Sequence, residues 1–385
     1  MKYRKFGHLD FKVSALGFGA MRLPTDGDMH NSDRLSSHIV EDEAIRMIRY
    51  AIDQGVNYID TAYPYHQGNS EIVTGKALKD GYRNRVKLAT KSPVFSITKA
   101  EDFNRYLDEQ LKRLQTDTID FYLLHGLSGD RWENTVKKLN LLEHAEIAKQ
   151  SGKIKHLGFS FHDNLDAFIE IVDGYEGWEF CQIQYNYMDI KNQAGTEGLK
   201  HAAAKGLAIV IMEPLLGGRL ANPPQEVLEI IKKNDTTYSP ADLAFQWLWD
   251  QKEVSVVLSG MSNMAQVQEN IRSANRSKIG ILEPKDFKAI ELIREKYHER
   301  TIIPCTKCGY CMPCSHNVDI PNNFSMYNEG IIHDDMKTAS LRYNNFFDKN
   351  KRADACTQCK ECEEKCPQNI PISHWMVKIH EDLTS

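Results

Sequence analysis

The chain between residues 56 and 124 contains Val56-Asn-Tyr-Ile-Asp-Thr61, Val86-Lys-Leu-Ala-Thr90 and Ile119-Asp-Phe-Tyr-Leu-Leu124, separated by two longer segments. Each quoted run is short and rich in β-branched, aromatic or other apolar residues, which is typical of a buried strand. The segments between them, Ser70–Lys79 and Lys99–Leu114, carry helical patterns. This stretch therefore predicts strands that alternate with helices, as in a parallel sheet with right-handed crossovers.

The same alternation extends from Val13 to Met261. Eight strands are predicted, at Ser14–Phe18, Val56–Thr61, Val86–Thr90, Ile119–Leu124, Ile154–Phe159, Phe180–Tyr185, Ala208–Met212 and Val254–Leu258. Further helices are predicted at Glu41–Gln54, Trp132–Gln150, Leu165–Val172, Thr196–Lys205, Pro240–Trp249 and Asn263–Ala274. Eight such units over about 250 residues fit a closed (β/α)8 TIM barrel better than an open sheet. No Gly-x-Gly-x-x-Gly turn follows the first strand, which also counts against the open sheet.

A smaller domain is predicted after the barrel. The boundary is placed next to Ile303-Pro304, which gives a barrel of residues 1–301 and a second domain of residues 302–385. Between the two cysteine runs of that domain, apolar residues recur at roughly helical intervals: Met326, Tyr327, Ile331, Met336, Leu341 and Tyr343. The second domain is therefore expected to be mainly helical and not a disordered linker.

The composition bounds the class of protein. The 385 residues are 41% hydrophobic and 26% charged, with a formal net charge of -5 spread over interleaved acids and bases. This is globular composition without a basic surface for nucleic acid or membrane lipid. The sequence shows no signal peptide and no apolar run of membrane-spanning length. We therefore expect a cytoplasmic protein with no nucleic-acid or membrane partner.

Eight of the nine cysteines follow Pro304 in two tight runs. The runs are Cys305-Thr-Lys-Cys308-Gly-Tyr-Cys311-Met-Pro-Cys314 and Cys356-Thr-Gln-Cys359-Lys-Glu-Cys362-Glu-Glu-Lys-Cys366-Pro367. Cysteines two residues apart can converge on one cluster from a single loop, and the second run matches the bacterial ferredoxin pattern. Two structural zinc sites are the alternative, but four cysteines in series would crowd one tetrahedral ion. The pattern thus predicts two 4Fe-4S clusters, while Cys181 is expected to be a core residue.

The fourth cysteine of each run is expected to ligate the cluster of the other run, as in two-cluster ferredoxins. One predicted ligand set is Cys305, Cys308, Cys311 and Cys366, and the other is Cys356, Cys359, Cys362 and Cys314. The first run departs from the pattern, because two residues and not three precede Cys314. Each run is followed by Ile-Pro, which indicates a pseudo-twofold pair of cluster loops.

Three consecutive predicted strands end on polar residues. Asp60 is the last residue but one of the second strand, Lys91 follows the third and His125 follows the fourth, while Tyr65 lies in the loop after the second strand. In a (β/α)8 barrel these ends share the face on which active sites lie. A lysine cation lowers the pKa of a nearby tyrosine, an aspartate balances the lysine, and a histidine can hydrogen-bond a substrate oxygen. The four residues are therefore the predicted catalytic group.

From Tyr3 to Ser273 the chain resembles the aldo-keto reductase family. The resemblance rests on Asp-Thr-Ala-x-x-Tyr at 60–65 with Ser70-Glu71, on Thr90-Lys91 and on Leu124-His125, which occur in family order. It implies that Tyr65 is the proton donor, that Lys91 and Asp60 tune it, and that His125 orients the carbonyl. The implied reaction is hydride transfer between a nicotinamide cofactor and a small-molecule carbonyl or alcohol.

The resemblance also implies a nucleotide site, with NADP(H) expected and NAD(H) as the alternative. Its predicted residues are Ser160, Gln182, Met212, Pro214, Leu215, Gly260, Ser262, Gln266, Glu269 and Asn270. Several depart from the family pattern. Phe161 stands where the family usually has Asn, Met212 stands where an aromatic often stacks on the nicotinamide, and Gly260 and Gln266 replace basic residues that pair with the 2′-phosphate.

With its cysteine runs, the whole chain resembles a bacterial subgroup of aldo-keto reductases with a ferredoxin-like tail. A nicotinamide transfers two electrons as hydride, whereas an iron–sulfur cluster transfers one electron at a time. A flavin normally links these two kinds of transfer, and the sequence shows no flavin signature. Three interpretations follow. The barrel is a reductase whose clusters exchange electrons with a partner protein or a bound redox cofactor; or a carbonyl reductase with purely structural clusters; or a binding module of a redox sensor or electron-transfer protein. The intact catalytic group argues against the third.

Overall fold

The computed structural model describes residues 1–26, 38–305 and 308–385. Within these ranges the chain forms two compact units. The first contains residues 1–26, 38–222 and 237–284, and the second contains residues 223–236 and 285–385. None of the described helices has both the length and the apolar composition that a membrane crossing requires.

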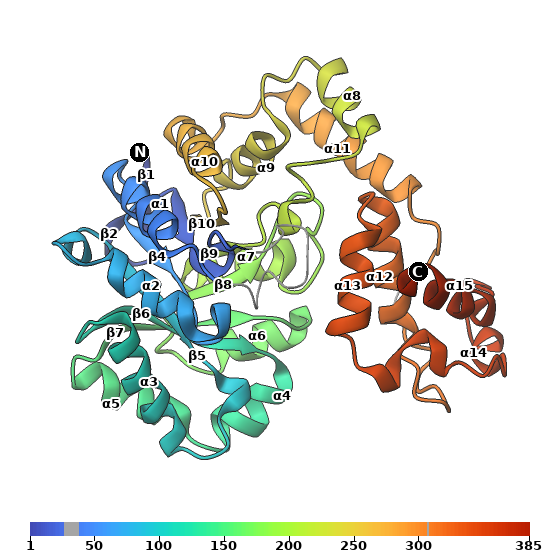
Figure 1. The fold of residues 1–385 in the computed structure, drawn as a ribbon, viewed down its shortest axis with the longest axis horizontal. Helices are drawn as coiled ribbons and strands as arrows, with labels where there is room; N and C mark the ends of the chain where they lie inside the picture. The colour runs from blue at the N-terminus through green and yellow to red at the C-terminus, as the bar shows by residue number, and fades with distance from the viewer. Residues whose placement is uncertain (27–37, 306–307) are drawn as a thin grey trace. The chain divides into compact units, whose positions relative to one another are not determined.

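The first unit is a closed barrel of eight parallel strands, which confirms the predicted (β/α)8 fold (Figure 1). Around the barrel the strand order is β10-β3-β4-β5-β6-β7-β8-β9. The strands are β3 (Leu16–Gly19), β4 (Tyr58–Asp60), β5 (Lys87–Ser92), β6 (Ile119–Leu127), β7 (Ile154–Phe161), β8 (Phe180–Gln184), β9 (Ala208–Met212) and β10 (Val254–Gly260). Each lies within two or three residues of its predicted position, because continuous apolar runs bounded by turns are typical of strands buried on both faces.

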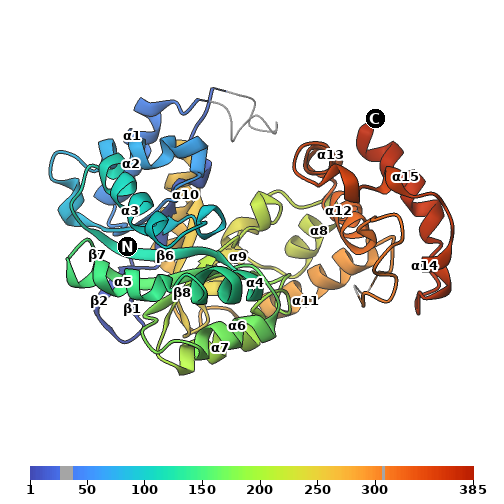
Figure 2. The same ribbon diagram turned by 90° about the horizontal axis from the view of Figure 1, so that it is seen from below.

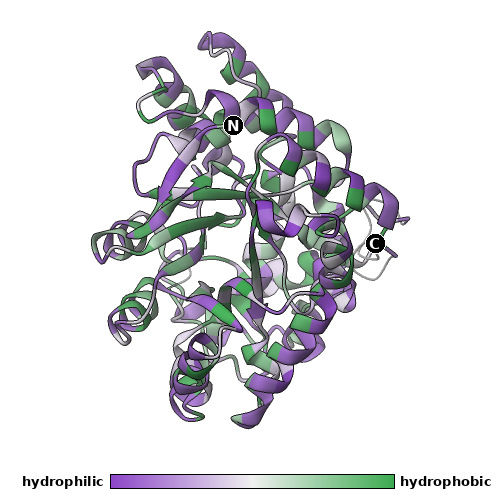
Figure 3. Ribbon diagram, turned by 90° about the vertical axis from the view of Figure 1, so that its left-hand side faces the viewer, coloured by the Kyte–Doolittle hydropathy of each residue, from purple (hydrophilic) through white to green (hydrophobic). Residues whose placement is uncertain are grey.

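Helices cover the barrel, and most of the longer ones are amphipathic. They are α1 (Glu41–Asp53), α2 (Asn69–Ala77), α3 (Glu101–Leu114), α4 (Gly129–Arg131), α5 (Leu141–Gln150), α6 (Leu165–Asp173), α7 (Gly195–Ala204), α9 (Pro240–Trp249) and α10 (Met264–Arg276). In α3, for example, Phe103, Leu107 and Leu114 are buried against the strands. Figure 3 shows this patterning, with hydrophobic residues along the strands and hydrophilic residues on the surrounding helices.

An antiparallel hairpin fills the N-terminal end of the barrel, and the sequence did not predict it. It consists of β1 (Tyr3–Phe6) and β2 (Leu9–Ser14). Phe6 packs inside the barrel, with its ring centroid 4.7 Å from that of Phe121 and 5.9 Å from those of Tyr58 and Phe180. Because aromatic side chains occupy this end, the opposite end, where the strands terminate, carries the polar residues.

The helix predicted over Trp132–Gln150 is interrupted in the structure. Residues Trp132–Lys137 form a π-helix, and α5 begins only at Leu141, after Asn140 adopts a left-handed backbone with φ 53°. Asn tolerates this conformation better than most residues, which explains the break inside an otherwise continuous apolar pattern. The helix α8 (Gln225–Lys233), which groups with the second unit, was also not predicted.

The second unit is mainly helical, as predicted (Figures 1 and 2). Besides α8 it contains α11 (Pro284–Glu299), α12 (Ile320–Ile332), α13 (Met336–Asn345), α14 (Glu361–Glu364) and α15 (Ile372–Thr384). The compact unit starts at residue 285, so α11 groups with it. The domain boundary between residues 301 and 302 stays a prediction.

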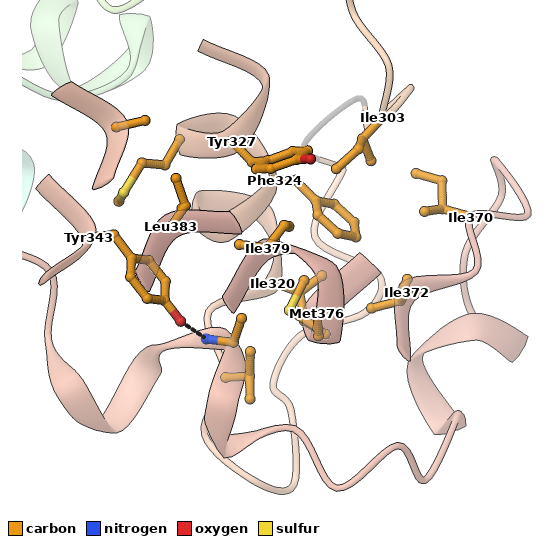
Figure 4. Packing of buried hydrophobic residues seen from close by; sticks show 14 residues of the cluster. Ile303, Ile320, Phe324, Tyr327, Tyr343, Ile370, Ile372, Met376, Ile379 and Leu383 are labelled. Atoms are coloured by element: carbon orange, nitrogen blue, oxygen red, sulfur yellow. Dashed lines mark hydrogen bonds between the residues drawn. The ribbon is translucent and has the colours of Figure 1, made fainter. Parts of the chain in front are cut away.

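A separate apolar core holds the second unit together (Figure 4). Phe324 and Tyr327 of α12 and Met376 and Ile379 of α15 belong to it and are almost fully buried. The buried Tyr343 accepts a hydrogen bond at its hydroxyl from the backbone N–H of Ala353, at 3.1 Å. Six of the eight cysteines of the two runs pack against this core: Cys305, Cys311, Cys314, Cys356, Cys362 and Cys366. The cysteine loops are therefore part of the packing of the unit.

Candidate active site and cysteine loops

Three neighbouring strands deliver the predicted catalytic residues to one end of the barrel. Asp60 is the last residue of β4, Lys91 is the last but one of β5, and His125 lies near the end of β6. The parallel registers Asp60↔Ala89 and Lys91↔Leu123 bring these strand ends side by side. Tyr65 begins a short 3-10 turn (Tyr65–Gly68) directly after β4. The structure thus brings all four residues together.

Lys91 is the centre of the group. Its side chain is fully buried, and its ammonium nitrogen donates to Asp60 Oδ1 at 2.6 Å, to the Thr61 carbonyl oxygen at 2.8 Å and to Tyr65 Oη at 3.3 Å. An ammonium has three N–H donors, so each is matched to one oxygen. Because Tyr65 accepts from Lys91, its own hydroxyl hydrogen is left to be donated. This arrangement presents a phenolic proton at the end of the barrel.

The electrostatics differ from the sequence-based expectation for Tyr65. Burial raises the pKa of the phenol above its usual value, and the charge of Lys91 lowers it only in part. Burial also raises the pKa of the Asp60 carboxyl, again opposed by Lys91. Burial lowers the pKa of Lys91, but Asp60 and Tyr65 together raise it above the usual value. The lysine therefore stays charged and Tyr65 keeps its proton at neutral pH, which suits a proton donor.

His125 lies against the phenol. The two rings meet edge-on with centroids 6.0 Å apart. Burial, helped by the positive charge of Lys91, holds the pKa of His125 well below 6.5. Its Nδ1 has no hydrogen-bond partner among the described residues. His125 is thus a neutral imidazole that can offer a hydrogen bond to a substrate oxygen beside Tyr65.

A buried carboxylate braces the strand that carries Lys91, and the sequence motif Ser70-Glu71 supplies it. Glu71 accepts hydrogen bonds from Thr90 Oγ1 at 2.7 Å, from Gln110 Nε2 at 2.6 Å and from Arg113 Nη1 at 3.3 Å. Gln110 also donates to the carbonyl oxygen of Lys91, at 3.1 Å. Gln110 and Arg113 were not predicted from the sequence. The available signal was a polar Gln110 on the buried face of α3.

The residues predicted to hold the nicotinamide carboxamide lie on neighbouring strands. Ser160 of β7 pairs in register with Gln182 of β8. Ser160 Oγ accepts a hydrogen bond from the Gly126 backbone N–H at 2.8 Å, so its own hydrogen is left to be donated. The buried Gln182 Oε1 has no partner among the described residues, while its Nε2 lies 3.6 Å from Met212 Sδ. A hydroxyl donor beside an unpaired amide oxygen fits a carboxamide, which both accepts and donates.

The remaining predicted nucleotide residues follow β9 and β10. Pro214 and Leu215 lie directly after β9, and Gly260 ends β10. Ser262 precedes α10, and Gln266, Glu269 and Asn270 lie on its first half. Several of them bond within the protein: Gln266 Oε1 accepts from Ser262 N–H, Asn270 donates to Ser259 Oγ, and Glu269 accepts from Ser239 Oγ. These hydrogen bonds hold the connection between β10 and α10 in place.

Arg22 was not predicted, and it lies over Gly260. A Cβ built on Gly260 would be 3.0–3.1 Å from the Cβ, Cγ and Cδ atoms of Arg22. The Arg22 guanidinium lies 3.8 Å from the Glu213 carboxylate. The basic side chain of Arg22 therefore lies beside Gly260, one of the two positions at which the predicted nucleotide site lacks a basic residue. The basic residue comes from the turn after β3, which no local motif indicates.

In the second unit the eight cysteines line two small pockets. Four cysteines line the first: Cys305, Cys308, Cys311 and Cys366. Four line the second: Cys314, Cys356, Cys359 and Cys362. Each cavity takes three cysteines from one run and the fourth from the other. In the described part of the chain, no group of three or more His, Cys, Asp or Glu side chains is arranged to hold a metal ion.

The two units match two known families. The aldo/keto reductase family matches residues 15–295, and the 4Fe-4S dicluster domain matches residues 301–370. Among characterised proteins, L-galactose dehydrogenase of Arabidopsis thaliana is 26% identical over 316 residues, covering 77% of this chain and 95% of that protein. The NADH-specific methylglyoxal reductase of Escherichia coli is 28% identical over 323 residues, covering 71% and 94%.

Solved structures agree with these matches. The holo form of aldo-keto reductase AKR11C1 from Bacillus halodurans is 27% identical, with a TM-score of 0.62, and covers 76% of this chain and 96% of that one. The apo form of the same enzyme has a TM-score of 0.59. The family match spans the strands of the barrel and the end at which Asp60, Lys91 and His125 lie. The protein is therefore an oxidoreductase that belongs to the aldo/keto reductase family and carries a C-terminal 4Fe-4S dicluster domain.

Proposed function

We propose that the barrel reduces a small-molecule carbonyl, or oxidises the corresponding alcohol, with NADP(H) as its nucleotide. The observation that carries the proposal is the buried Lys91, whose three donors are matched to Asp60, Thr61 and Tyr65. This arrangement leaves the Tyr65 hydroxyl hydrogen as the one proton of the group that can be transferred. Relatives named as a dehydrogenase and a methylglyoxal reductase support carbonyl–alcohol chemistry.

A bound nicotinamide would supply the hydride in reduction and accept it in oxidation. The protein supplies the rest. Tyr65 Oη gives its proton to the carbonyl oxygen as that oxygen gains negative charge, and His125 donates a hydrogen bond that orients the same oxygen. Lys91 stabilises the phenolate that remains, and Asp60 balances the lysine. Ser160 and Gln182 are proposed to hold the carboxamide, with the segment from Gly260 to Asn270 and Arg22 next to the nucleotide phosphates.

We also propose that each cysteine-lined cavity holds one 4Fe-4S cluster, with the crossed ligand sets that line the cavities. The leading proposal is that the clusters exchange electrons one at a time with a redox partner. A structural role is the second candidate, because six of the cysteines pack against the core of the unit. In both cases the barrel chemistry is the same.

The test uses anaerobically purified holoprotein. NADPH and NADH are each mixed with it, first alone and then with aldehydes and ketones, while nucleotide oxidation and the cluster spectrum are recorded. Carbonyl-dependent nucleotide oxidation, faster with NADPH, is expected. Cluster reduction by NADPH without a carbonyl would favour electron exchange, and clusters that stay oxidised would favour the structural role. If neither NADPH nor NADH binds, the proposal is contradicted and a sensor is favoured.

A further inference from the structure

An arginine with unused donors lies at the catalytic end of the barrel. Arg131 is the last residue of α4, in the connection after β6. It is partly buried, and its Nη1 donates to the carbonyl oxygen of Gly126, the residue after His125. This bond uses one of five N–H groups of the guanidinium. Arg131 Nη1 and the His162 ring both lie beside Gly126, the residue that follows His125.

Phe95 and His162 lie near Arg131. The Phe95 ring centroid is 5.9 Å from the guanidinium carbon and 5.6 Å from the His125 ring, and Phe95 is 48% exposed. At Gly126, which has φ 64°, a Cβ would lie 3.2 Å from Arg131 Nη1 and 3.8 Å from His162 Cδ2. A cation, an imidazole and an exposed aromatic ring therefore gather beside His125.

Arg131 has no acidic partner among the described residues, and in this it resembles Arg4, whose guanidinium donates instead to the carbonyl oxygens of Trp249 and Gln251. Two other partly buried arginines of the barrel are paired: Arg83 with Asp120 at 2.7 Å, and Arg113 with Glu71 at 3.3 Å. Within the described ranges, Arg131 has no ion pair with a carboxylate. A guanidinium that is partly removed from water without a counter-charge is costly to keep unless a ligand provides that charge.

We propose that Arg131, with His162 beside it, binds a carboxylate of the substrate, so that the carbonyl compounds reduced here are oxo acids. This inference rests on the proposed function and names its substrate class. The guanidinium edge that does not face Gly126 offers a donor pair that matches the two oxygens of a carboxylate. Phe95 provides an apolar wall for the carbon skeleton between that carboxylate and the carbonyl group at Tyr65.

Matched acids and esters test the proposal. The substrates are 2-oxo-2-phenylacetate with its methyl ester and 4-formylbenzoate with its methyl ester, reduced by wild type, Arg131→Gln and Arg131→Lys. The control is Arg85→Gln, because Arg85 forms an exposed ion pair with Asp53 before β5, at the other end of the barrel. Wild type should prefer each acid. Arg131→Gln should lower kcat/KM for the acids about tenfold to a hundredfold and leave the esters within about twofold, as expected for a charged hydrogen bond.

Arg131→Lys should keep part of the preference for acids over esters, because a lysine keeps the positive charge but lacks the paired N–H donors of a guanidinium. Equal losses for acid and ester would overturn the proposal and leave Arg131 as a brace of the Gly126 turn. The nucleotide dissociation constant should not change in Arg131→Gln; a loss there would instead assign the arginine to a nucleotide phosphate.

A binding experiment separates this proposal from the proposed function. Benzoate and benzamide are titrated calorimetrically into holoprotein with NADP+, and neither can be turned over. Tighter binding of benzoate in wild type, lost in Arg131→Gln, supports the anion site even if no carbonyl compound is reduced. No difference between benzoate and benzamide would overturn the anion site even if carbonyl reduction is observed.

Discussion

The predicted catalytic group of the barrel and the cysteine loops of the second unit satisfy their polar groups in different ways. In the barrel, every N–H of the buried Lys91 ammonium meets an oxygen of the chain itself. In the second unit, burial raises the pKa of Cys362 to about 11, and the neighbouring Cys356 and Cys314 add to this effect. Thiolates gathered at such a site need a compensating cation, which cluster iron would supply.

The barrel and the second unit should therefore depend on their cofactors to different degrees. The catalytic group is arranged before any ligand binds, so losing the nucleotide should cost the barrel little. The cysteines both line the cavities and pack against the core, so losing the clusters should cost the second unit its fold.

Removing the iron should unfold the second unit and spare the barrel. Anaerobic protein is expected to contain about eight irons, as two four-iron clusters require. After chelation, amide hydrogen exchange measured by mass spectrometry should become fast in α12 and α15 and stay slow in β5 and β6. Protection that persists in α12 and α15 would show that the core holds without clusters. Stoichiometric zinc with no iron would contradict the cluster assignment.

The variant Tyr65→Phe should lose the proton donor and keep the fold. Removal of a general acid typically costs about a hundredfold to ten-thousandfold in rate, and we expect a kcat loss in that range. Nucleotide affinity should be nearly unchanged. Tyr63→Phe is the matched control, because its hydroxyl bonds Glu109 at 3.1 Å and not Lys91. Comparable activity in the two variants would mean that the catalytic group of the barrel is not used.

The pH profile of carbonyl reduction should report Tyr65. Because burial raises the pKa of Tyr65 above 10, the phenol keeps its proton through the neutral range and loses it only at higher pH. The rate of reduction should therefore be level near neutral pH and fall as the pH rises through that raised pKa. Lys91 acts to lower this pKa, so Lys91→Met should move the decline to still higher pH. A decline centred well below pH 10 would contradict this assignment.

The sequence was sufficient to predict elements with a regular apolar pattern and sites whose residues lie close together along the chain. Strands such as Ile119–Leu127 were predicted because an apolar run ended by turn residues is typical of a strand inside a (β/α)8 barrel. Asp60, Lys91 and His125 could be grouped because all parallel strands end at the same face. The two cysteine runs were informative because cluster ligation fixes their spacing.

The parts that were missed depend on tertiary packing. The β1–β2 hairpin is short and charged, and only the aromatic contacts of Phe6 inside the barrel show its role. The break at Asn140 depends on one left-handed residue in a continuous apolar pattern. The expected lowering of the Tyr65 pKa considered its charged neighbour Lys91 and not the burial of the phenol, which outweighs it. Burial of a single group cannot be read from local sequence.

The smallest effect is expected when Glu71, the buried carboxylate that braces the strand of Lys91, is replaced. Glu71 and Glu109 both bond Arg113, but only Glu71 is fully buried and also accepts from Thr90 and Gln110. Glu71→Gln replaces one acceptor oxygen by a donor that faces existing donors. We expect it to lower the free energy of unfolding by about 1–3 kcal/mol, the cost of leaving buried partners unsatisfied.

The matched variant Glu109→Gln should lower the free energy of unfolding by no more than about 1 kcal/mol, as is typical of exposed ion pairs. Urea unfolding of the holoprotein, followed by a probe in the barrel, measures both variants. Because Thr90 precedes Lys91 on β5, Glu71→Gln should also reduce kcat while Glu109→Gln leaves it unchanged. Equal effects of the two variants on stability and kcat would show that the buried carboxylate does not position Lys91, and that the catalytic group is held by Asp60 and Thr61 alone.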